Sequence, residues 1–178
     1  ATIDCGGQCL APGLVDLRVQ LREPGEEYKE TLASAGRAAA AGGITSMVAL
    51  PNTDPVIDDV SVVEFVARRA RLLALAKVYV YAAATKGLKG QDLAEMGMLA
   101  EAGAAAVTDG PFAIADSQVM RRCLTYAANF GLVVVQRPED PSLAGGGSMN
   151  QGELATRLGL GGIPREAEII MVERDLRL

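Results

Sequence analysis

Polar and apolar side chains alternate strictly in residues 13–22, which read GLVDLRVQLR. Successive side chains of a β-strand point to opposite faces, so Arg18, Gln20 and Arg22 are predicted to share one face. A strand inside a parallel sheet is normally apolar on both faces. The polar face therefore indicates either the lining of a site or the solvated face of an edge strand, and the pattern leaves both open. Asp16 completes the polar face, and the other face is apolar, with Val15, Leu17, Val19 and Leu21.

Further polar side chains follow the later segments that we expect to be strands. Ligands of α/β proteins bind at the carboxyl ends of parallel strands, so these side chains are candidates for one shared site. A set of guanidinium, amide and carboxylate groups at one end of a sheet suits an anionic small molecule. In chain order the set comprises Asn52, Thr85, Asp109, Arg137, Glu139 and Asp140.

The sequence contains no histidine. Imidazole is the common zinc ligand and the common general base near neutral pH, so any mechanism that needs either is excluded for this chain by itself. Cys5 and Cys9 have the spacing C-x-x-x-C, which is a weak metal motif. We interpret these two cysteines and Cys123 as reduced thiols, buried or incidental.

Apolar segments of strand length alternate with helical segments along the chain. Strands are predicted at 13–22, 44–50, 78–84, 104–107 and 132–136, and helices at about 30–41, 59–75, 91–102 and 116–130. This alternation is typical of βαβ units and therefore of an α/β fold with a parallel sheet. A glycine-rich loop is predicted over 143–151, with helices at 152–158 and about 165–177.

The predicted architecture is part of a TIM-barrel-like (β/α) barrel. A complete barrel of eight units takes about 250 residues, whereas this chain has 178 residues and about five units. We therefore expect one partial domain over 1–178, either as an open sheet or as a piece of a longer protein. The first and last strands of such a sheet have unpaired outer edges, so we expect the chain to form homo-oligomers or to dock on another surface.

Composition excludes several classes of partner. The net charge of −5 disfavours binding to phosphate backbones, so we expect no nucleic-acid partner. No apolar run approaches the roughly 20 residues of a membrane span, and the start of the sequence lacks the pattern of a secretory signal. We expect a cytoplasmic protein that does not contact membranes.

Several motifs resemble those of type I bacterial dihydroorotases, which belong to the amidohydrolase superfamily. The segment APGLVDLRVQLREPG at 11–25 is similar to the family pattern P-G-(L/F)-V-D-x-H-x-H-x-R-E-P-G. AAAAGGIT at 38–45, PNTDP at 51–55 and EDPSLAGGGSMNQGE at 139–153 resemble later family motifs in the same order. The resemblance covers essentially the whole chain, and it implies a zinc-dependent amidohydrolase on a (β/α)₈ barrel. Such an enzyme hydrolyses the cyclic amide of dihydroorotate, and the reverse reaction closes carbamoyl-aspartate.

The departures from the family pattern fall on the metal site. Arg18 and Gln20 replace the paired histidines of the first strand, and Arg137 replaces the histidine before the ED motif. Arginine is a permanent cation without a lone pair to donate, so it repels Zn²⁺. Asp109 matches an aspartate of the family's metal site, but one carboxylate does not make a zinc site. We expect no bound zinc and no catalytic residues.

The resemblance carries two substrate-binding positions over to this chain, namely Arg22 and Asn52. Both are expected either to bind an anionic ligand or to survive as internal hydrogen-bond partners. We also expect the guanidinium of Arg18 or Arg137 to replace the metal's charge by pairing with Asp109, or with Asp16 or Glu139, and we favour Arg18 for this role.

Three functions follow from these observations. The first is a non-catalytic dihydroorotase-like protein of pyrimidine biosynthesis that acts as a structural partner of aspartate transcarbamoylase, a partner implied by the resemblance alone. The second is an active zinc-dependent cyclic amidohydrolase completed by residues outside this chain. The third is a module that binds an anionic small molecule.

Overall fold

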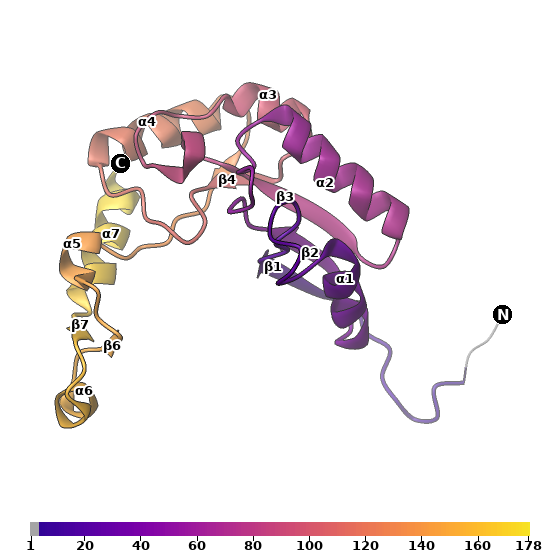
Figure 1. Cartoon of the computed structure of the whole chain (residues 1–178), viewed down its shortest axis with the longest axis horizontal. Coiled ribbons are helices and arrows are strands. Elements are labelled where there is room, and N and C mark those ends of the chain that lie inside the picture. Colours follow the sequence, from indigo (N-terminus) through magenta and orange to yellow (C-terminus); the bar gives the residue numbers. More distant parts are fainter. Residues whose placement is uncertain (1–3) are drawn as a thin grey trace.

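Five parallel strands form a curved open sheet, which is half of a barrel. The computed structural model describes residues 4–178, and Figure 1 shows the strands as an arc at the centre of the molecule. The spatial order equals the chain order, and each strand pairs in parallel with the next. This confirms the predicted α/β partial barrel. The strands are β1 (Leu14–Val19), β2 (Ile44–Ala49), β3 (Lys77–Ala83), β4 (Ala106–Thr108) and β5 (Val133–Val134).

Four helices cover the convex side of the sheet (Figure 1). Three of them begin at side chains that accept a hydrogen bond from the first turn, which satisfies a backbone N–H group left without a partner there. These capping residues are Thr31, Asp59 and Asp116. The helices are α1 (Leu32–Ala41), α2 (Val60–Leu73), α3 (Met96–Glu101) and α4 (Ser117–Ala128), and the short 3₁₀ helix η1 (Lys86–Leu88) follows β3.

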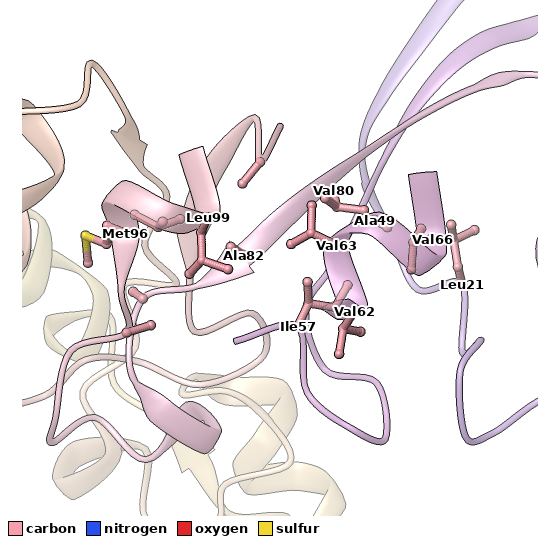
Figure 2. Close-up of a cluster of buried hydrophobic side chains, with 14 of the residues drawn as sticks. Leu21, Ala49, Ile57, Val62, Val63, Val66, Val80, Ala82, Met96 and Leu99 are labelled. Atoms are coloured by element: carbon pink, nitrogen blue, oxygen red, sulfur yellow. The ribbon is translucent and has the colours of Figure 1, made fainter. Parts of the chain in front are cut away.

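The main hydrophobic core lies between the sheet and these helices. Figure 2 shows side chains from α2 and α3 facing those of β2 and β3, with Ile57 among them. A second, smaller cluster lies on the concave face of the sheet and contains Val48, Leu50, Tyr81 and Ala106. The two clusters use alternate residues of the same strands, as the pleat of a strand requires.

The first strand is more irregular than its sequence pattern predicts. Its pairing with β2 shifts register twice, and the strand ends at Val19. Val15 and Leu17 are 60% and 62% exposed, whereas Leu21 is 1% exposed. The strict alternation predicted as one strand over 13–22 therefore does not hold over its whole length. The register shifts break the period of two, and β1 is the outer strand of the sheet, so the concave side beside it has no covering strand in this chain.

A carboxyl-terminal arm extends away from the sheet (Figure 1). The predicted glycine-rich loop is partly ordered here, because β6 (Met149–Asn150) pairs in parallel with β7 (Gly162–Ile163). Gly147 is required at this point, since a Cβ atom there would lie 2.5 Å from Cγ1 of Ile163. The arm also contains α5 (Pro141–Ala144), α6 (Glu153–Leu158) and α7 (Glu166–Arg177).

Hydrogen bonds from Arg174 connect α7 to the half-barrel. The Arg174 guanidinium group donates to the carbonyl oxygens of Ala115 and Ile114, at 2.6 and 2.9 Å. Among the described residues, no helix is long and apolar enough to cross a membrane.

Candidate functional site

A cavity of about 260 Å³ opens on the concave face at the carboxyl ends of the strands. It brings together two of the predicted site residues, because Arg18 of β1 and Arg137 after β5 both line it. Its remaining lining combines aliphatic side chains with hydroxyl and amide groups: Leu17, Leu50, Tyr81, Thr108, Gly110, Val135 and Gln136. The cavity therefore presents two permanent cations and no carboxylate.

Gln20 and Arg22, the other predicted site residues of the first-strand segment, form hydrogen bonds with nearby residues. Arg22 has a backbone φ of 58°, and its guanidinium group donates to Glu26 at 2.8 Å and to the amide oxygen of Gln20. Lys29 pairs with the same Glu26 carboxylate, and this hydrogen bond is the largest cause of a lowered Glu26 pKa. Arg22 and Gln20 thus belong to a local polar network, which fits the interpretation of Arg22 as an internal hydrogen-bond partner.

Asn52 lies close to the cavity and forms no ion pair with any residue from 4 to 178. It follows β2, is half-buried, and its amide oxygen lies 4.0 Å from where a Cβ atom of Gly110 would be. The next residue, Thr53, is buried and donates to the carbonyl oxygen of Pro55 at 2.7 Å, which holds the loop after the strand. The loop therefore places Asn52 beside the cavity that Arg18 and Arg137 line.

Asp109 is buried and bound to Thr85. Its carboxylate accepts hydrogen bonds from the backbone N–H and the hydroxyl group of Thr85, at 2.8 and 2.6 Å. The Thr85 hydroxyl in turn accepts from the N–H of Gly90 at 2.8 Å. Burial raises the pKa of Asp109, against the opposing effect of the Thr85 hydrogen bonds. Asp109 therefore links the ends of β3 and β4, and its chain neighbours, rather than Asp109 itself, line the cavity.

Of the three carboxylates that we considered as the partner of a guanidinium, Asp109 is wrong, and the preference for Arg18 as the guanidinium is wrong as well. Arg137 pairs instead with Glu139 at 3.2 Å, which confirms one of the three carboxylates that we considered. Within residues 4–178 the side chain of Arg18 has no ion pair, although its backbone N–H donates to Asp16 at 2.9 Å. Both members of the Arg137–Glu139 pair are more than a third exposed, so the pair contributes only about 0–1 kcal/mol.

The donors at this site do not fit a zinc ion. Two of the positions at which the resemblance implies histidine ligands hold guanidinium groups, and the amide oxygen of the third, Gln20, is bound by Arg22. The Asp109 carboxylate is committed to Thr85. Among residues 4–178, no group of three or more cysteine, aspartate, glutamate or histidine side chains could hold a metal.

Tyr81 is 7% exposed and lines the cavity from β3, although it was not among the predicted site residues. The segment YVY at 79–81 could have indicated it, because alternate residues of a strand share a face and the two tyrosines would therefore lie on the same side of the sheet. No hydrogen bond joins the Tyr81 hydroxyl to another residue in the described part of the chain.

A half-barrel of parallel strands with polar side chains at the carboxyl ends of the strands is the arrangement of part of a (β/α) barrel. The fold is similar to that of the L-hydantoinase (dihydropyrimidinase) from Arthrobacter aurescens, with a TM-score of 0.77 and 20% identity over 98% of this chain and 40% of that chain. The family model described as dihydro-orotase-like matches residues 7–178. The chain belongs to this dihydro-orotase-like family.

Curated relatives agree with this assignment. The chain is 50% identical to a dihydroorotase of Syntrophobacter fumaroxidans and 48% identical to one of Desulforapulum autotrophicum, over 100% and 99% of its length. These alignments cover 40% and 42% of the relatives. The chain thus spans about two fifths of the length of the curated relatives that it matches.

Proposed function

We propose that this chain is a non-catalytic dihydroorotase-like protein of pyrimidine biosynthesis that acts as a structural partner of aspartate transcarbamoylase. The family assignment supports the pathway, and the resemblance implies the partner. The proposed absence of catalysis is supported by one observation. Two guanidinium groups, those of Arg18 and Arg137, line the same cavity at the strand ends. Two fixed positive charges oppose binding of Zn²⁺, which acidifies water and polarises the scissile carbonyl in enzymes of this chemistry.

Zinc analysis tests this proposal directly. We expect the purified chain, supplied with zinc and then desalted, to retain substoichiometric metal and to hydrolyse no dihydroorotate. A matched variant with Arg18→His, Gln20→His and Arg137→His removes both cations and adds imidazole nitrogens, so we expect it to retain more zinc than the native chain. Elemental analysis and a dihydroorotate absorbance assay provide the readouts. Stoichiometric zinc with turnover by the native chain contradicts the proposal.

An active zinc-dependent cyclic amidohydrolase is the alternative. It would need ligands from residues outside this chain. It is favoured by two observations, the family assignment and the two-fifths coverage of the relatives. The charges of Arg18 and Arg137 oppose it, because they remain in the cavity whatever else is added. The same metal and turnover assays on the protein in its natural length separate the two functions.

We propose that the open edges and the concave face form the surface that a partner contacts. Val15, Leu17 and Val133 are each at least 60% exposed, and they lie on the two outer strands of the sheet. Exposed apolar surface beside unpaired strand edges favours association. We expect light scattering to show a homo-oligomer, and a mixture with aspartate transcarbamoylase to co-elute.

A double variant tests this surface. Val15→Lys with Val133→Lys adds charge to both edges, so it is expected to shift the chain towards monomer and to abolish co-elution. Leu72→Lys on the exposed side of α2 is the control and is expected to change neither result. A native chain that stays monomeric at high concentration and elutes apart from aspartate transcarbamoylase would argue against both partners.

A further inference from the structure

The cavity at the strand ends has the wrong charge for a metal and the right charge for an anion. The chain carries a net charge of −5, yet the cavity lining contains Arg18 and Arg137 and no carboxylate. Within residues 4–178, Arg18 has no ion pair, and Arg137 pairs only with Glu139, whose side chain is 38% exposed. A ligand can displace an exposed pair of this kind at little cost.

Hydroxyl groups from two further strands complete the donor set. Tyr81 is more than nine-tenths buried, lines the cavity from β3, and its hydroxyl bonds to no other residue in the range 4–178. Thr108 of β4 is also buried, and its hydroxyl oxygen accepts from the N–H of Gly110 at 3.0 Å. An oxygen that accepts in this way keeps its own proton free to donate.

We infer that this cavity binds a small phosphoryl anion, held by Arg18 and Arg137 together with the Tyr81 and Thr108 hydroxyl groups. Arg18, Tyr81 and Thr108 lie on three different strands, and Arg137 follows a fourth, β5, so the four donors approach a ligand from different sides. A tetrahedral phosphate offers oxygens in all these directions, whereas the two oxygens of a carboxylate lie in one plane. Guanidinium forks match phosphate oxygens in bidentate fashion.

The apolar part of the lining points to a phosphate ester rather than to the free ion as the natural ligand. Leu17, Leu50 and Val135 supply aliphatic surface beside the charged groups. A volume of about 260 Å³ exceeds what a phosphate alone fills, and leaves room for a short organic group. The donors bind the phosphoryl group, and the aliphatic side chains contact the remainder of the molecule.

This inference rests on the proposed function, because the anion would occupy the place of the zinc ion that the proposed function excludes. Titration calorimetry on the full chain in phosphate-free buffer provides the test, with inorganic phosphate, glycerol phosphate and acetate as probes at matched ionic strength. We expect both phosphates to bind more tightly than acetate. Arg18→Ala and Arg137→Ala are each expected to weaken phosphate binding about tenfold, in the range of a lost charge-assisted contact.

Two further variants separate the role of the Tyr81 hydroxyl group from a general loss of positive charge. Tyr81→Phe removes only the hydroxyl, leaves the packing of the buried ring in place, and is expected to weaken phosphate binding by a smaller factor. Arg68→Ala removes an exposed cation from α2 and is expected to leave binding unchanged. Binding of acetate as tight as phosphate, equal losses in Arg68→Ala, or no heat with either phosphate each overturn the inference. If the metal assay also finds no zinc, the proposed loss of catalysis survives such a result.

Discussion

Replacing Asp109 by alanine is expected to lower the free energy of unfolding by about 2–3 kcal/mol at neutral pH. The substitution leaves the buried N–H and hydroxyl of Thr85 without their acceptor, and it also relieves the cost of burying a carboxylate. In a chain of this size each 1 kcal/mol lowers the melting temperature by roughly 2–4 °C. Thermal or urea unfolding followed by circular dichroism measures the change.

Asp58→Ala is the matched control for this substitution. Asp58 accepts one exposed hydrogen bond, from the N–H of Gly87, in the turn that also contains Thr85. We expect its loss to cost less than about 1 kcal/mol, because water replaces the lost partner. Equal costs for the two substitutions would mean that the buried network contributes nothing beyond an exposed contact.

The stability of the chain should also depend on pH through Asp109. Burial raises the folded-state pKa of this carboxyl group above the ordinary value of 3.8, so the folded state favours the protonated form. The associated stability is fully present below about pH 3.8 and is lost as the pH rises through the raised pKa. Measured from acid to neutral pH, the native chain should therefore lose stability relative to Asp109→Asn, which does not titrate. A difference that stays constant, or that grows in favour of the native chain, would contradict the raised pKa.

Replacing Ile57 by alanine is expected to cost about 3–4 kcal/mol of unfolding free energy, because the lost transfer energy adds to that of a cavity. Ile57 belongs to the loop between β2 and α2, yet it is fully buried among Val62 and Val63 (Figure 2). Its backbone is fixed as well, because its N–H donates to Pro51 and its carbonyl accepts from Ala83. The surrounding atoms therefore have little freedom to fill the space.

Leu72→Ala is the control for this cavity. Leu72 lies on α2 and is 75% exposed, so its truncation removes a similar number of atoms without opening a hole. We expect a change within about 0.5 kcal/mol. Urea unfolding of both variants gives the comparison. A loss of unfolding free energy below about 1 kcal/mol for Ile57→Ala would show that neighbouring side chains move in and fill the cavity.

The sequence by itself determined the order of elements and the absence of imidazole side chains. Alternating strand and helix segments predicted the parallel sheet, since local hydrophobic period and chain order are enough to specify βαβ units. The absence of histidine excluded imidazole chemistry without any coordinates. The meeting of Arg18 and Arg137 in one cavity was also foreseeable, because parallel strands bring their carboxyl ends to one edge of the sheet.

Only the tertiary structure decided which of these side chains share the cavity and which do not. Arg22 turns to Glu26 and Gln20, and Asp109 to Thr85, because hydrogen-bond partners depend on loop conformation rather than on strand order. A period of two would have placed Val15 and Leu17 with the buried Leu21, but β1 shifts register twice against β2 and lies at the edge of the sheet, and Val15 and Leu17 are exposed. The place of Tyr81 in the cavity likewise depends on the curvature of the sheet, which follows from the packing of all five strands and is not encoded in any one of them.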